Sequence, residues 1–97
     1  MAKVNFNKTL RDCFGNEIES NGKKQSIKEV VCIRLFSASD GFTEEEKYNA
    51  YRLMNRIAAS DGAVEIEDKD SVLIKKICEK SLTAGAWGQL VDILKGE

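Results

Sequence analysis

Between residues 43 and 81, the hydrophobic positions form two helical stripes separated by a short alternating stretch. The first stripe lies in residues 43–60 and comprises Ala50, Leu53, Met54, Ile57 and Ala58. The second lies in residues 68–81 and comprises Leu73, Ile74, Ile77 and Cys78. Spacings of three and four residues put each set on one side of a helix. Two such helices bury their apolar sides against each other or against a common partner.

Capping residues mark where helices begin. Thr43 and Glu46 stand at the spacing of a capping box, and Ser26 and Glu29 repeat that spacing. Ser26 therefore starts a helix that we expect to reach about residue 39. A strand competes with this helix, because residues 30–33 are rich in β-branched side chains.

The first 20 residues have the alternation of a half-buried β-hairpin. Val4, Phe6 and Leu10 fall on alternate positions, and residues 12–16 contain turn-forming side chains. Residues 17–19 would form the return strand. A short strand near residues 64–66 can extend this hairpin.

The end of the chain predicts a fourth helix, for which Thr83 is the capping residue. Gly85 and Gly88 fall inside its pattern, which indicates close approach to a neighbouring element or a later start. The predicted fold class is α+β: an N-terminal β-hairpin packed on a bundle of four short helices. We expect residues 1–97 to form a single domain.

Composition narrows the classes of function. The chain has 97 residues, no histidine and a net charge of −1. The lack of histidine excludes Ser-His-Asp and Cys-His catalytic sites, and the charge argues against a dedicated nucleic-acid binder. No apolar run approaches the ~20 residues of a membrane span, and the opening residues lack a long apolar segment. We therefore expect a cytoplasmic protein that does not enter membranes.

Metal and thiol chemistry are poorly supported. The loop at 61–72 departs from the calcium-binding EF-hand pattern, because Gly62 is second instead of sixth and Val72 replaces the final glutamate. The three cysteines, Cys13, Cys32 and Cys78, are interpreted as reduced thiols. We predict no metal ion, no cofactor and no enzymatic activity.

Charge is concentrated in the centre of the chain, where residues 36–70 hold nine acidic and four basic side chains. A solvated face explains this cluster, and a basic partner is the alternative. The candidate partner-binding residues are Trp87, Glu44, Glu45, Glu65 and Glu67. Trp87 is included because tryptophan is enriched at interface hot spots, although a place in the core is the more expected explanation.

Short motifs are spread over nearly the whole chain, from Val4-Asn5-Phe6 through Ile27-Lys28 and Val64-Glu65-Ile66 to Asp92-Ile93-Leu94. In their order and spacing, they resemble a family of small tailed-bacteriophage and prophage proteins with no assigned activity. The resemblance implies a phage context and a location in the bacterial host cytoplasm, and it transfers no catalytic residue. The chain departs from the family pattern in lacking a proline near Asn16 and in having Trp87 where an aliphatic residue is usual. The matching positions are Val4-Asn5-Phe6, Leu10, Asp12, Gly15, Ile18, Ile27-Lys28, Glu46-Lys47, Ile57, Val64-Glu65-Ile66, Asp70, Leu73-Ile74-Lys75-Lys76, Gly88-Gln89 and Asp92-Ile93-Leu94.

These patterns favour a non-enzymatic interaction protein that works by protein–protein contacts, as a virion assembly factor or a modulator of a host factor. Its partner would be a phage or host protein, or a second copy of the chain. The alternative is a weak nucleic-acid-binding accessory protein that uses Lys75, Lys76 and Lys80, although nucleic acid is the less expected partner.

Overall fold

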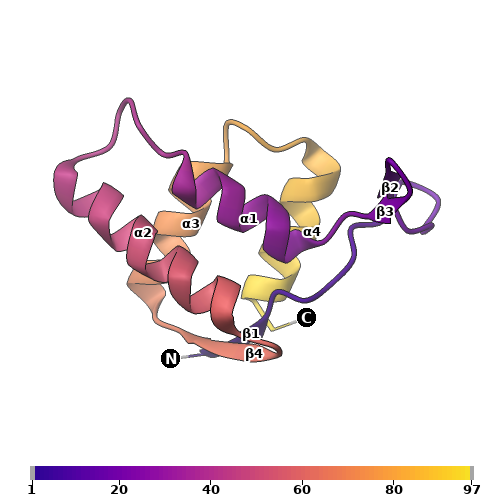
Figure 1. Cartoon of the computed structure of the whole chain (residues 1–97), viewed down its shortest axis with the longest axis horizontal. Helices are drawn as coiled ribbons and strands as arrows, with labels where there is room; N and C mark the ends of the chain where they lie inside the picture. The colour runs from indigo at the N-terminus through magenta and orange to yellow at the C-terminus, as the bar shows by residue number, and fades with distance from the viewer. Residues whose placement is uncertain (1, 97) are drawn as a thin grey trace.

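Four helices and two small antiparallel sheets make up residues 2–96, the part of the chain that the computed structural model describes (Figure 1). The predicted α+β class is confirmed. None of the helices in this range is long and apolar enough to cross a membrane. The prediction of one domain over residues 1–97 extends one residue beyond the described range at each end. In chain order the elements are β1 (Ala2–Asn5), β2 (Glu19–Ser20), β3 (Lys23–Lys24), α1 (Ile27–Phe36), α2 (Glu44–Ala59), β4 (Ala63–Ile66), α3 (Asp68–Cys78) and α4 (Ala84–Leu94).

Helix starts follow the predicted caps. The Thr43 hydroxyl accepts a hydrogen bond from the Glu46 N–H at 3.1 Å, and the Glu46 carboxylate accepts one from the Thr43 N–H at 3.0 Å. Ser26 caps α1 and Thr83 caps α4 in the same way, each through its side-chain oxygen. Each cap satisfies an N–H group that the first helical turn leaves unpaired.

The β-rich run at residues 30–33 lies within α1, so the helical prediction is confirmed there. This helix ends at Phe36, three residues before the predicted end at Ser39. Gly41 then adopts a φ of +88° in the connection to α2, a conformation that L side chains rarely adopt.

The pairing of the first strand differs from the predicted hairpin. Strand β1 pairs with β4 in antiparallel register, with Val4 opposite Val64, instead of with residues 17–19. The turn at 12–16 exists, and a single bridge joins Arg11 to Glu17 across it. A separate two-residue hairpin, β2–β3, turns through Asn21 and Gly22, both of which have positive φ.

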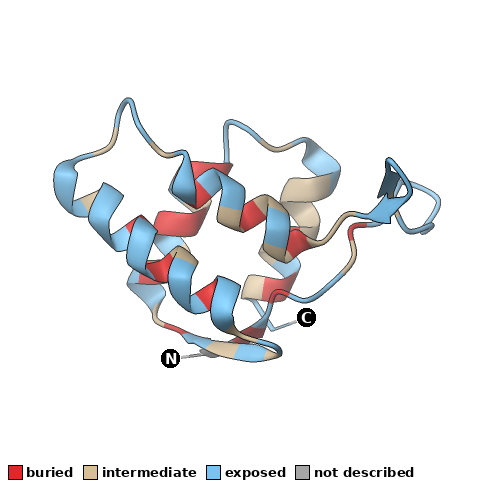
Figure 2. Ribbon diagram, viewed as in Figure 1, coloured by how far each residue is buried: buried red, intermediate tan, exposed pale blue. Residues whose placement is uncertain are grey.

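Helices α1 and α2 lie side by side and run antiparallel (Figure 1). The Lys28 ammonium donates to the Ser60 carbonyl at 2.6 Å, and the Cys32 Sγ lies 4.0 Å from the Met54 carbonyl oxygen. Figure 2 shows that the buried positions of the helices turn inward and that their outer sides are exposed. The core cluster comprises Val4, Phe6, Leu10, Ile27, Val31, Leu35, Ala50, Leu53, Ile57, Ile66, Leu73, Ile74, Ile77, Cys78, Leu90 and Ile93.

Two details of packing correct the sequence interpretation. Ala58 was placed in the buried stripe of α2 but is exposed. The helix begins at Ala84, so Gly85 and Gly88 both lie within α4 and no later start accounts for them. Within the described residues, nothing lies within 4 Å of a Cβ added at Gly85 or Gly88. Neither glycine is therefore explained by close approach of another element.

Candidate functional site

The outer side of the α1–α2 pair gathers exposed apolar side chains. Among the described residues, six large hydrophobic side chains are exposed, and four of them belong to these two helices. They are Ile33, Phe36, Tyr48 and Tyr51, which we call the α1–α2 aromatic surface, with exposed fractions of 61%, 71%, 59% and 52%. Clustered exposure of this kind marks interaction surfaces, whereas scattered apolar residues need no explanation.

Helical geometry arranges these four side chains as two neighbouring pairs, one on each helix. Ile33 and Phe36 are three residues apart on α1, as are Tyr48 and Tyr51 on α2, and residues at this spacing are neighbours on a helix surface. The two tyrosine rings stack with centroids 6.4 Å apart. Cys32 lies against Met54, and the two helices run antiparallel. Phe36, one turn after Cys32, is level with the turn of α2 before Met54, which contains Tyr51. Phe36 and Tyr51 therefore lie at the same level on the two adjacent helices, and both are exposed.

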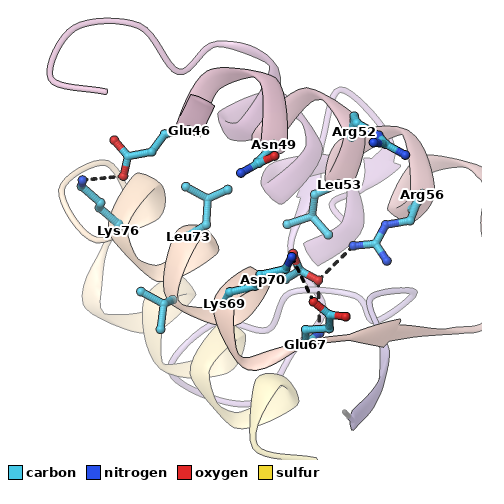
Figure 3. A pocket seen from close by; sticks show the side chains of 11 residues that line it. Glu46, Asn49, Arg52, Leu53, Arg56, Glu67, Lys69, Asp70, Leu73 and Lys76 are labelled. Carbon is cyan, nitrogen blue, oxygen red and sulfur yellow. Dashed lines mark hydrogen bonds and ion pairs between the residues drawn. The ribbon is translucent and has the colours of Figure 1, made fainter. Parts of the chain in front are cut away.

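A second candidate is a half-open groove of about 420 Å³ between α2 and α3. Leu53 and Leu73 contribute its apolar part, and Asn49 points toward the space between the helices (Figure 3). One end is closed by the ion pair of Lys76 with Glu46, whose nitrogen and oxygen are 2.6 Å apart. The groove thus has an apolar centre and charged ends.

The other end of this groove is organised by Asp70, the one buried charged side chain within residues 2–96. Its Oδ2 accepts a hydrogen bond from Arg56 Nη2 at 3.0 Å and another from the Glu67 N–H at 3.1 Å (Figure 3). The second bond caps the start of α3. Asp70 therefore ties α2 to α3 and is already satisfied without a ligand.

The charges of the groove largely neutralise one another. Besides the Glu46–Lys76 and Arg56–Asp70 pairs, it contains a third ion pair, in which Lys69 lies 3.3 Å from Glu67. The hydrogen bond from Lys76 is the main cause that lowers the pKa of Glu46, and the Thr43 N–H adds to it. In the described part of the chain, no buried side-chain nitrogen or oxygen lacks a hydrogen-bond partner. The groove therefore offers no buried, unpaired polar atom that would define a ligand.

The acidic candidate residues fall in separate places. Glu44 and Glu45 are exposed in the first turn of α2, where Glu44 stands one turn before Tyr48. Glu65 is exposed on β4 opposite Lys3, and Glu67 lines the α2–α3 groove. No three acidic or cysteine side chains among the described residues come close enough to hold a metal ion.

Trp87 lies on α4, which is at the other end of the molecule from the start of α2 (Figure 1). Its side chain is half-buried and packs against the core cluster. Contacts with the core therefore account for the buried part of the Trp87 side chain. The structure does not bring Trp87 together with the acidic candidates.

The basic candidate residues do not form one free face. Lys75 and Lys76 are consecutive in α3, so their side chains leave the helix in different directions. Lys76 is paired with Glu46. Lys80 is exposed beyond the last residue of α3.

The cysteines differ in their access to solvent. Cys78 is fully buried in the core, and burial raises the pKa of its thiol to about 11. Cys32 is half-buried, and burial raises the pKa of its thiol as well. Cys13 is exposed in the turn at 12–16. Because the thiolate is the nucleophile, burial makes Cys32 and Cys78 poor nucleophiles near neutral pH.

Phe14, beside Cys13, is the most exposed large hydrophobic side chain described, at 85%. The Asp12 carboxylate holds its turn by accepting hydrogen bonds from the N–H groups of Phe14 at 2.9 Å and Asn16 at 3.0 Å. The loop that precedes β2 and contains Phe14 projects away from the helices (Figure 1). Phe14 is therefore a single exposed ring outside the α1–α2 aromatic surface.

The sequence interpretation missed the α1–α2 aromatic surface. Its candidate partner-binding residues did not include Ile33, Phe36, Tyr48 or Tyr51. The available signal was the spacing of three residues between Tyr48 and Tyr51, on the side of α2 away from Leu53 and Ile57.

Comparison with known proteins adds no relative. No protein-family model matches the chain, and neither curated proteins nor solved structures include a significant match.

Proposed function

We propose that this chain is a small non-enzymatic interaction protein that acts by protein–protein contacts. The observation that carries the proposal is the α1–α2 aromatic surface. It joins three aromatic side chains and one isoleucine on two adjacent helices, each more than half exposed. A few residues supply most of the binding energy at protein interfaces, and tyrosine is enriched among them.

The size of this surface supports the proposal. An aromatic side chain offers about 150–250 Å², so the exposed parts of Phe36, Tyr48 and Tyr51 together come to roughly 350 Å². With Ile33, the apolar area reaches the upper part of the range of about 300–600 Å² for the largest patch on a monomer. Covering such an area releases water from apolar surface, which favours association.

The chemistry of the remaining candidates favours a role without catalysis. Cys32 and Cys78 have raised thiol pKa values, and Asp70 is held by two hydrogen-bond donors. General acids and nucleophiles work best when their pKa lies near the working pH and a reacting group can reach them. Cys32 and Cys78 do not meet the first condition, and the Asp70 Oδ2 atom is already occupied by two donors.

The setting we propose is a phage or prophage protein in the cytoplasm of the bacterial host, as an assembly factor or a modulator of a host protein. Its support is the sequence resemblance. Nucleic-acid binding through Lys75, Lys76 and Lys80 is less favoured, because the Lys76 ammonium is neutralised by Glu46. That pairing removes one of the three cations available for phosphate contacts.

The test is affinity capture of the tagged protein from infected or lysogenic cells, followed by mass spectrometry. We compare wild type, a variant carrying both Phe36→Ser and Tyr51→Ser, and the control Phe14→Ser, which removes an exposed ring elsewhere. Wild type and the control should capture a partner, and the double variant should lose it. A second copy of the chain that carries a different tag counts as a partner. Capture that survives the double variant, or no reproducible partner of either kind, would refute the proposal.

A further inference from the structure

We infer that the α1–α2 aromatic surface binds the same surface of a second copy of this chain, which makes the protein a symmetric dimer. This inference rests on the proposed function and identifies one partner for it. A two-fold axis through the surface would place each residue of one copy against the corresponding patch of the other. The α1–α2 pair of one copy would then pack face to face on the α1–α2 pair of the other.

The area of the surface matches what such a dimer needs at its centre. A standard interface buries about 800 Å² on each partner, and its central part is more apolar than its rim. The roughly 350 Å² offered by the three rings is close to half of that area. The neighbouring polar side chains of α1 and α2 are exposed and can supply the rim.

Charge does not oppose association between copies. The whole chain carries a net charge of −1, so two copies repel each other only weakly at long range. Beside the surface, Glu44 and Lys47 stand one turn before Tyr48 and Tyr51 and carry opposite signs. Glu29, one turn before Ile33, is paired with Lys23 at 3.0 Å. Because charged side chains of both signs lie beside the surface, opposite charges can meet across the two-fold axis.

The apolar side chains of the surface are also suited to packing against the same side chains of a second copy. The stacked rings of Tyr48 and Tyr51 present aromatic faces and edges, which pair favourably with other aromatic rings. The Arg52 guanidinium, 5.9 Å from the centre of the Tyr48 ring, can keep that cation–π contact at the rim. A partner with the same composition therefore offers both the apolar centre and the polar edge that the surface requires.

The test is sedimentation equilibrium of the purified full chain over the widest concentration range that absorbance allows. Wild type should change from the 10.8 kDa of one chain to twice that mass as concentration rises. Loss of an aromatic anchor costs tenfold or more in affinity, and a symmetric dimer loses two anchors for each substitution. Phe36→Ser should therefore weaken dimerisation by roughly a hundredfold, and Tyr51→Ser should act similarly.

Phe14→Ser is the matched control, because it removes a ring of equal size that is exposed outside the surface. All variants replace exposed side chains, and circular dichroism should confirm that each keeps its helices. A single-chain mass at every concentration would overturn the inference, as would dimers that Phe36→Ser leaves unchanged or that Phe14→Ser dissociates.

This outcome is separable from that of the capture experiment. If wild type is monomeric but captures a different protein through the α1–α2 aromatic surface, the dimer is refuted and the proposed function stands. If wild type is monomeric and captures nothing, both are refuted.

Discussion

Replacing Asp70 with alanine should lower the free energy of unfolding by about 2 kcal/mol. The substitution removes two contacts of one carboxylate oxygen. The hydrogen bond from the Glu67 N–H caps α3, and loss of a helix cap costs about 1 kcal/mol. The ion pair with Arg56 adds up to about 1 kcal/mol, because the Arg56 side chain is half exposed and solvent screens the attraction.

Urea unfolding followed by circular dichroism measures this loss, and thermal unfolding should show a midpoint lowered by roughly 8–16 °C. Asp70→Asn should be less damaging, because its amide oxygen can still accept from the Glu67 N–H. Asp68→Ala is the control. Asp68 is an exposed acid in the same turn of α3, and its removal should cost about 0.5 kcal/mol or less.

A double-mutant cycle with Arg56→Ala separates the two contacts of Asp70. In the Arg56→Ala background, Asp70→Ala should cost only the cap, about 1 kcal/mol. The reasoning fails if Asp70→Ala costs less than about 0.5 kcal/mol, or if Asp68→Ala is equally destabilising.

Four further predictions concern two glycines, the thiols and an ion pair. Gly88→Ala should stabilise the protein by up to about 1 kcal/mol in urea unfolding, because the added Cβ meets no atom within 4 Å among the described residues. Gly41→Ala should destabilise it instead, because φ is +88° there, and a gain would contradict the assigned conformation. A disulfide reagent at pH near 8 should label Cys13 rapidly and Cys78 only in urea. Rapid labelling of folded Cys78 would contradict its burial and its pKa of about 11. The pKa of Glu46 is lowered by its ion-paired lysine in α3, so this pair stabilises the fold above pH 4.5 and loses its effect as pH falls through the lowered value. Glu46→Gln should therefore reduce stability near neutral pH and give a shallower loss in acid, and parallel pH–stability curves would refute this.

The helix boundaries could be predicted because their determinants are local. Thr43 and Glu46 satisfy each other's backbone groups within one turn, whatever the rest of the chain does. Thr83 starts α4 by the same local chemistry. In α1, the capping Ser26 and the helical spacing of the buried positions prevailed over the β-rich run at 30–33, because tertiary packing outweighs intrinsic propensity.

Strand pairing and the candidate surface depended on contacts that are distant in sequence. In the sequence, the strand-like segment nearest to β1 is at 17–19, but β1 pairs with β4. No residue near Val4 specifies β4 as the partner. The proximity of Phe36 to the tyrosine side of α2 likewise depends on the antiparallel register of two helices. Single-helix periodicity predicts which side of α2 is buried. It does not predict which exposed side chains of different helices become neighbours.

The pairing of β1 with β4 also bears on how the protein is made. Translation proceeds at about 5–20 residues per second, so the roughly 60 residues between the paired strands take on the order of 3–12 s to synthesise. During that interval, β1 has emerged or is emerging from the ribosome before its partner exists. Its backbone hydrogen-bonding groups and the side chains of Val4 and Phe6 are then open to other nascent chains or to chaperones.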